Sequence, residues 1–172
     1  MALEAGAQDV LLAYQPVGPN LRGFFKLSKA WPDVKLSTVV DCRAIAQQLA
    51  SAGQIIDVFI DVDCGMHRTG ITPGEDAIAL FRDLREISNL RFRGWHVYDG
   101  HLHQSQLADR QSAVAECFAP VWEMIASTDP TATVIAGGTP TFPIHAHDSR
   151  VICSPGTCVF WDAGYASKVP DM

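Results

Sequence analysis

A short apolar strand, a polar turn and an amphipathic helix follow one another repeatedly along the chain. The pattern predicts strands at Asp9–Tyr14, Lys35–Val40, Ile56–Asp63, Leu90–Tyr98, Ala132–Ala136 and Val151–Trp161, the last interrupted at Pro155. Helices are predicted at Asn20–Ala30, Cys42–Ala52, Gly74–Ser88 and Ser105–Thr128, where apolar residues recur at spacings of three and four. Strands that alternate with helices in this way indicate a parallel sheet covered by helices.

Polar or glycine-rich residues follow every predicted strand, which favours a barrel over an open sheet. In an open doubly wound sheet such residues gather at one switch point, whereas in a (β/α)8 barrel of the TIM type they ring the carboxyl ends of the strands. The chain has 172 residues, fewer than the roughly 250 that are typical of a closed barrel. The predicted fold class is therefore α/β, an incomplete TIM-type barrel that forms one domain over residues 1–172.

Composition and charge exclude several classes of function. With 48% hydrophobic and 19% charged residues, the chain is typical of a soluble globular domain. A net charge of −6 and scattered basic residues argue against a nucleic-acid partner. No apolar run approaches the roughly 18 to 20 residues that cross a bilayer, and no signal-peptide pattern begins the chain. The five cysteines form no C-x-x-C pair, so we expect free thiols, no membrane association and a cytoplasmic location.

Two aspartates, Asp61 and Asp63, fall on one face of a strand whose other face is aliphatic. Carboxylates that are buried without donors are costly, so a partner is expected nearby. Arg68, in the turn that follows, is the nearest candidate in the sequence. The alternative is an ordinary turn with a surface arginine.

Glycine-bearing turns, Gly137–Thr139 and Ser154–Thr157, follow the last two predicted strands. Glycine lets backbone N–H groups approach an anion closely, and the loops after the last two strands of a barrel often hold a phosphate. Two such turns in succession indicate a phosphate site, although a glycine pair by itself is usually only a turn.

His96 and Tyr98 share the parity of Gly94, so they are predicted to face the barrel interior while Trp95 and Val97 pack under the helices. Their rings are suited to contact a planar ligand. The alternative is a structural aromatic layer with satisfied polar tips.

Two H-x-H pairs have the spacing of metal ligands. They are His101 with His103 and His145 with His147. A zinc hydrolase is therefore a second possibility, although histidines in loops are more often solvated.

Taken in order, these segments resemble the fold-type III pyridoxal-phosphate enzymes, within them the D-threonine aldolase and D-serine dehydratase group, related to the alanine racemase barrel. Glu4–Tyr14 resembles that group's third strand, and Asp61–Gly70 resembles its Asp-x-Gly-x-x-Arg-x-Gly signature. Gly94–His101, Gly137–Thr139 and Ser154–Tyr165 match the later blocks. The resemblance implies a partial alanine-racemase-like barrel, strands three to eight, from which the C-terminal β domain is absent.

The resemblance also implies pyridoxal 5′-phosphate as the cofactor and a set of residues that hold it. Those expected at the phosphate are Gly137, Gly138, Thr139, Gly156 and Thr157. Those expected near the ring are Arg68, His96, Tyr98, His103 and Ser154. Ser154 stands where the racemase has an arginine at the ring nitrogen, which fits the aldolase and dehydratase side better.

Two parts of the family pattern have no counterpart here. The family's Schiff-base lysine lies upstream of every segment present, and the four lysines of this chain are interpreted as surface residues: Lys26, Lys29, Lys35 and Lys168. No catalytic residue is therefore predicted. The family's metal pair belongs to the C-terminal domain, so no metal ligand is predicted, and zinc or manganese is expected only in the full-length enzyme.

The leading hypothesis is a fragment of a pyridoxal-phosphate-dependent lyase that acts on small D-β-hydroxy amino acids and is inactive alone. A non-catalytic pyridoxal-phosphate-binding protein of the homeostasis type and a metal-dependent barrel hydrolase are the alternatives. We expect a homodimer for the full-length enzyme and self-association of this chain through its open strand edges.

Overall fold

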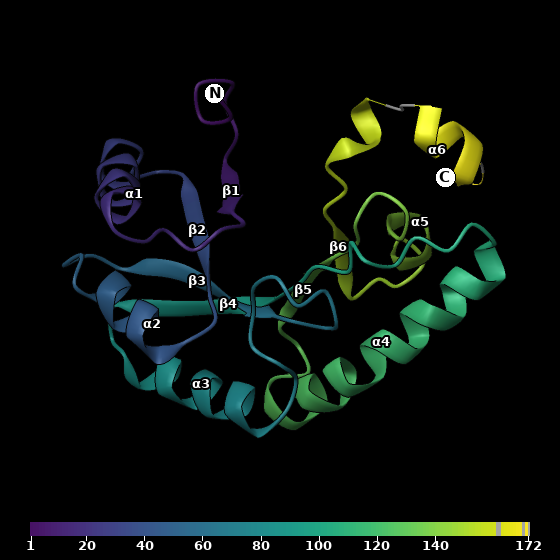
Figure 1. The fold of residues 1–172 in the computed structure, drawn as a ribbon. Coiled ribbons are helices and arrows are strands. Elements are labelled where there is room, and N and C mark those ends of the chain that lie inside the picture. The colour runs from purple at the N-terminus through teal and green to yellow at the C-terminus, as the bar shows by residue number, and fades with distance from the viewer. Residues whose placement is uncertain (161–162, 170, 172) are drawn as a thin grey trace.

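Parallel strands form one continuous sheet in the computed structural model, which describes residues 1–160, 163–169 and 171. The strands are β1 (Asp9–Leu12), β2 (Lys35–Val40), β3 (Ile56–Val62), β4 (Leu90–Val97), β5 (Thr133–Ala136) and β6 (Val151–Cys153). Each strand is hydrogen-bonded to the next in chain order. The sheet curls so that β1 and β6 rise on opposite sides of β3 and β4 (Figure 1). This half-barrel confirms the α/β class and agrees with an incomplete TIM-type barrel.

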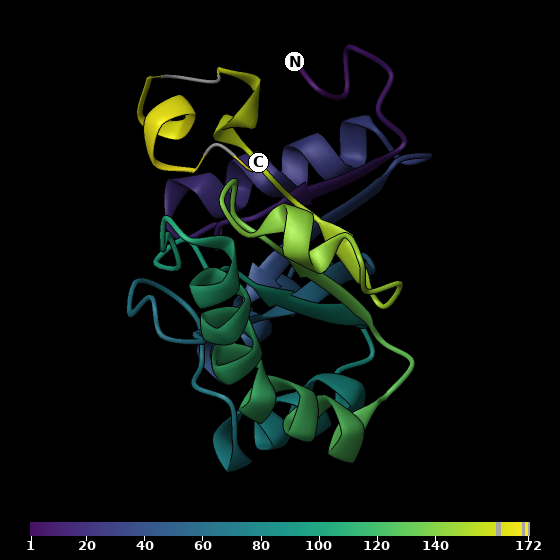
Figure 2. The same cartoon turned by 90° about the vertical axis from the view of Figure 1, so that its right-hand side faces the viewer.

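Helices connect the strands on the convex side of the sheet (Figures 1 and 2). They are α1 (Pro19–Ala30), α2 (Arg43–Ala50), α3 (Glu75–Glu86) and α4 (Leu107–Thr128). Short elements follow: α5 (Phe142–His145), the 3₁₀ helix η1 (Thr157–Val159) and α6 (Ala163–Lys168). Among the described residues, no helix is both long enough and apolar enough to cross a bilayer.

The core lies between the sheet and its helices. β3 is buried along its whole length, and its aliphatic face packs in the core together with residues of α2, α3 and α4. Phe92 and Trp95 of β4 meet Phe81 of α3, with ring centroids 4.9 to 5.9 Å apart. Trp95 and Val97 therefore pack under the helices, as their parity predicts.

A bulge in β4 changes which side chains face the inside of the half-barrel. Val58 of β3 lies opposite Phe92 and Phe59 lies opposite Gly94, so Arg93 has no partner in the register. Because of this extra residue, Phe92 faces the helices like Trp95, although strict alternation would put them on opposite faces.

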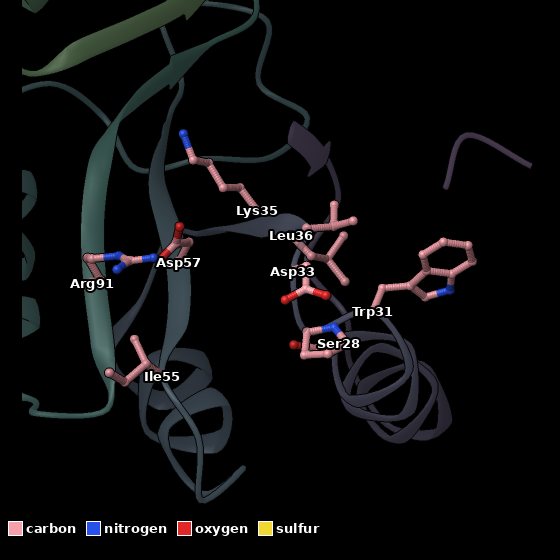
Figure 3. A pocket seen from close by; sticks show the side chains of 10 residues that line it. Ser28, Trp31, Asp33, Lys35, Leu36, Ile55, Asp57 and Arg91 are labelled. Atoms are coloured by element: carbon pink, nitrogen blue, oxygen red, sulfur yellow. The ribbon is translucent and has the colours of Figure 1, made fainter. Parts of the chain in front are cut away.

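The amino-terminal ends of β2 to β4 carry a charged cluster. Asp57, only 4% exposed, accepts hydrogen bonds from Nε of Arg91 at 2.6 Å and from Nη1 of Arg93 at 2.7 Å. Figure 3 shows Arg91 reaching from β4 to Asp57 beside a hollow of about 180 Å³ that also includes Lys35. Because residues at this end of a barrel generally serve stability, we interpret the cluster as structural.

The predicted strand Val151–Trp161 is wrong beyond its first three residues, Val151–Cys153. β6 ends at Cys153, and the chain then enters the 3₁₀ helix η1. Pro155 has no N–H with which to continue the ladder, so the strand cannot extend through it. Trp161 lies outside the described residues. The other predicted strands exceed the observed ones by no more than two residues at their ends.

Candidate functional site

The carboxyl ends of the strands surround a cavity of about 370 Å³ on the concave side of the sheet. Its lining consists of Leu11, Ala13, Tyr14, Arg68, His96, Tyr98, Ile135 and Ser154. These residues come from the ends of β1, β3, β4, β5 and β6 or from the turns that follow them. Four predicted ring-side residues therefore lie together: Arg68, His96, Tyr98 and Ser154.

Arg68 lies between aromatic rings and does not pair with the aspartates. Its guanidinium carbon is 4.7 Å from the ring centroid of Tyr98 and 5.8 Å from that of Tyr14. The expected ion pair with Asp61 or Asp63 is thus wrong, because both carboxylates have nearer donors. Cation–π contacts of this kind leave the planar donors of the guanidinium available to a ligand.

Asp61 pairs instead with His96, the residue opposite it on β4. Oδ1 of Asp61 is 2.6 Å from Nδ1 of His96, and both side chains are less than one-tenth exposed. Because His96 also lines the cavity, the carboxylate fixes the orientation of a ring that a ligand would touch.

Asp63 holds the turn that carries Arg68. Its Oδ1 accepts the N–H groups of Gly65 at 3.0 Å and His67 at 2.9 Å, and its Oδ2 lies 3.1 Å from Nδ1 of His67. Burial, the largest single effect, raises the pKa of Asp63, but these hydrogen bonds together lower it below its usual value. Gly70 closes the turn at φ 100°, where a Cβ would lie 2.7 Å from the backbone nitrogen of Asp63, so only glycine fits.

The glycine turns after β5 and β6 meet through their hydroxyls. Oγ1 of Thr139 and Oγ1 of Thr157 are 3.0 Å apart, and the Thr157 hydroxyl also bonds to that of Tyr165. Among the described residues, no atom apart from those of its chain neighbours lies within 4 Å of the point where a Cβ on Gly156 would stand, so its backbone is open to approach. The structure thus joins the two turns that were predicted to bind phosphate.

Gly138, by contrast, uses its backbone N–H within the protein. That N–H donates to Oδ1 of Asp99 at 2.8 Å. The same carboxylate accepts the Thr141 hydroxyl at 2.8 Å, and its Oδ2 lies 2.8 Å from Nε2 of His145. Sequence reasoning overlooked Asp99, although its position two residues after β4 and directly before Gly100 was a usable signal.

The H-x-H pairs form no metal site in the described part of the chain. His145 is buried against Asp99, whereas His103 and His147 are exposed. No group of three or more His, Cys, Asp or Glu residues within residues 1–160, 163–169 and 171 is arranged to hold a metal ion. His103 also lies apart from the cavity lining, unlike the other predicted ring-side residues.

Residues 19–163 match the family described as alanine racemase, N-terminal domain. The chain is 26% identical over 172 aligned residues to 3-hydroxy-D-aspartate aldolase of Paracoccus denitrificans, covering 93% of this chain and 44% of that protein. It is 28% identical over 115 residues to D-threonine aldolase of an Arthrobacter species, covering 64% of this chain and 30% of the relative.

Solved structures of D-threonine aldolase and alanine racemase also match the chain. The D-threonine aldolase of Filomicrobium marinum superposes with a TM-score of 0.83 at 26% identity, over 98% of this chain and 47% of that one. The alanine racemase of E. faecalis has a TM-score of 0.71 at 19% identity, which shows a shared fold, over 97% of this chain and 44% of the racemase. The chain spans less than half the length of these relatives. It belongs to the alanine racemase N-terminal domain family, in the fold-type III group of pyridoxal-phosphate proteins.

Proposed function

We propose that this chain forms the cofactor-holding part of a pyridoxal-phosphate-dependent lyase that acts on small D-β-hydroxy amino acids. The observation that carries the proposal is the cavity at the carboxyl ends of the strands, with Arg68, His96, Tyr98 and Ser154 in its wall. Two relatives are named for aldolase activity on D-threonine and on 3-hydroxy-D-aspartate, which are both D-amino acids with a β-hydroxyl.

The residues present fit a planar, phosphate-bearing cofactor. The cavity volume, about 370 Å³, lies within the roughly 300 to 1,000 Å³ typical of small-molecule sites. Aromatic and cationic groups form its wall, and the Thr139 and Thr157 hydroxyls meet beside the open backbone of Gly156. Hydroxyl and N–H donors are the groups that bind phosphate oxygens in loops of this kind.

Each side chain has a proposed task. Thr139, Thr157 and the Gly156 backbone would bind the phosphate, Arg68 would lie along the ring edge, and Ser154 would face the ring nitrogen. When bound, pyridoxal phosphate supplies an electron sink for charge that develops on the substrate. An uncharged hydroxyl at the ring nitrogen favours the aldolase or dehydratase reaction over racemisation.

His96 and Tyr98 have the remaining tasks in the cavity wall. His96 would donate its Nδ1–H to the Asp61 carboxylate, which orients the ring and leaves Nε2 as the nitrogen that can accept a hydrogen bond or a proton from a ligand. Tyr98 would present its ring to the cofactor while it supports the Arg68 guanidinium.

We further propose that the chain binds its cofactor without a covalent bond and catalyses little or nothing alone. No lysine lines the cavity among the described residues: Lys26, Lys29 and Lys168 lie on helices, and Lys35 begins β2 at the opposite end of the sheet. The same observation supports the second candidate, a non-catalytic pyridoxal-phosphate-binding protein. We propose that the full-length enzyme binds the divalent metal, contains a C-terminal β domain and forms a homodimer. Residues 1–172 would form one partial barrel domain of that enzyme.

Cofactor titration tests the proposal. Pyridoxal phosphate added to the chain should change tryptophan fluorescence and cofactor absorbance at one equivalent, and Arg68→Ala should weaken this binding. Arg85→Ala is the matched control, since Arg85 also lies against an aromatic ring, Phe81 at 5.7 Å, but on the convex side. Equal binding by both variants would contradict the assigned site.

Activity and covalent binding are separate readouts. Incubation with pyridoxal phosphate, manganese and D-threonine should release no measurable glycine or acetaldehyde, and robust turnover would refute the inactivity. After borohydride reduction, mass spectrometry should find no stoichiometric adduct at a single lysine. One fully modified lysine would overturn non-covalent binding.

A further inference from the structure

Asp99 lies two residues after the end of β4, is fully buried, and contacts the turn that follows β5. Three donors from one segment surround its carboxylate: the Gly138 N–H and Thr141 hydroxyl at Oδ1, and the His145 ring at Oδ2, each at 2.8 Å. Asp99 does not line the cavity, so any effect on a ligand must act through these neighbours.

The donors hold the segment from Gly138 to His145 in one closed conformation. The carbonyl of Gly138 accepts the N–H groups of Thr141 at 3.0 Å and Phe142 at 2.9 Å, so the turn folds back onto its own start. The His145 ring packs on Phe118 of α4, with centroids 4.6 Å apart. Asp99 therefore fastens this turn both to β4 and to the helical layer.

Thr139 lies between Gly138 and Thr141, the two turn residues that Asp99 holds at the same oxygen. Its side chain is 4% exposed, and its hydroxyl meets that of Thr157 at 3.0 Å. A hydroxyl can bind phosphate well only when its backbone is fixed before the ligand arrives. The Asp99 carboxylate supplies this restraint through its hydrogen bonds to Gly138 and Thr141.

We propose that Asp99 is the positioning residue for the phosphate end of the site, acting through Gly138 and Thr141 to fix Thr139. This inference rests on the proposed function. Positioning and simple electrostatics predict opposite changes in phosphate affinity when the Asp99 charge is removed. Removal of a negative charge close to an anion site would by itself strengthen phosphate binding, whereas loss of positioning weakens phosphate binding.

The test compares pyridoxal phosphate with pyridoxal, which lacks the phosphate, in the wild type and in Asp99→Asn. The ratio of the two affinities isolates the phosphate contribution. Asp57→Asn is the control, because Asp57 is equally a buried carboxylate with short hydrogen bonds, but at the opposite end of the strands. Thr141→Val removes one donor, and Thr141→Ser restores its hydroxyl in case Asp99→Asn fails to fold.

We expect Asp99→Asn to reduce the ratio about tenfold, which corresponds to the loss of roughly one hydrogen bond to a charged group. Thr141→Val should reduce the affinity ratio about threefold, and Thr141→Ser should restore the ratio. Asp57→Asn should lower the melting temperature but leave the affinity ratio unchanged. An unchanged or increased ratio in Asp99→Asn, or in Thr141→Val if the first variant is unfolded, would overturn the inference. If the wild type itself does not prefer pyridoxal phosphate, the proposed function fails and the inference fails with it.

Discussion

Removal of the His96 ring should destabilise the fold more than removal of its partner. In His96→Ala the side chain of Asp61, a residue that is 4% exposed, loses its hydrogen bond at 2.6 Å, the only side-chain hydrogen bond that Asp61 makes within the described residues. A buried carboxylate that is left without its partner costs about 3 to 5 kcal/mol. Asp61→Ala leaves one ring nitrogen of His96 unpaired, which costs about 1 to 3 kcal/mol.

Urea denaturation of the two single variants and a double variant measures these costs. Asp61→Leu combined with His96→Phe removes both polar groups and keeps the site filled with side chains, so it should cost less than His96→Ala alone. Asp83→Ala is the control: Asp83 accepts Arg43 at 2.9 Å in an exposed pair, so its loss should cost below about 1 kcal/mol. A double variant as unstable as the sum of the single ones would refute a coupled buried pair.

Three further predictions concern the rim and the open edge. Because the folded-state pKa of Asp63 is lowered, its carboxylate stabilises the fold above its unfolded pKa, and this stability disappears as pH falls through the folded value. The stability difference between wild type and Asp63→Ala should therefore shrink below about pH 4, and a difference that is constant from pH 3 to 6 would contradict it. A side-chain hydrogen bond that the Cys64 thiol donates to Cys117, together with burial, raises the pKa of Cys64. Iodoacetamide should therefore modify Cys64 more slowly than the exposed Cys42, as peptide mass spectrometry would show; equal rates would refute this. Leu12, 41% exposed on the outer strand β1, should promote self-association, and light scattering should show smaller species for Leu12→Lys; a wild-type monomer would contradict that.

The strands and the rim follow from local patterns in the sequence. Alternation along β3 separates Asp61 from the aliphatic residues, and the parallel arrangement brings all carboxyl ends to one edge. For this reason the sequence predicts that the turns with Arg68, Tyr98 and Ser154 meet at one rim, although these residues are far apart in the chain. The family resemblance added the cofactor, which no periodicity contains.

The partners of these residues depend on register and could not be predicted. Asp61 meets His96 because the two strands pair at those positions, and this register includes the extra residue Arg93. Sequence proximity suggested Arg68 as the partner instead. In the same way Asp99 meets Gly138 and His145 across about 40 residues, a contact that requires the positions of β4, β5 and α5 together.

The cavity rim divides into two halves that are stabilised differently. On the side of β1, β3 and β4, Arg68 is exposed and held by ring contacts with Tyr14 and Tyr98, which leave it free to move toward a ligand. On the side of β5, the turn with Thr139 is buried and fixed by Asp99 through hydrogen bonds. A phosphate has the same shape in every substrate complex, whereas the ring and its substrate change during a reaction. Rigid restraint at the phosphate end and adaptable contacts at the ring end are therefore what a cofactor site of this kind requires.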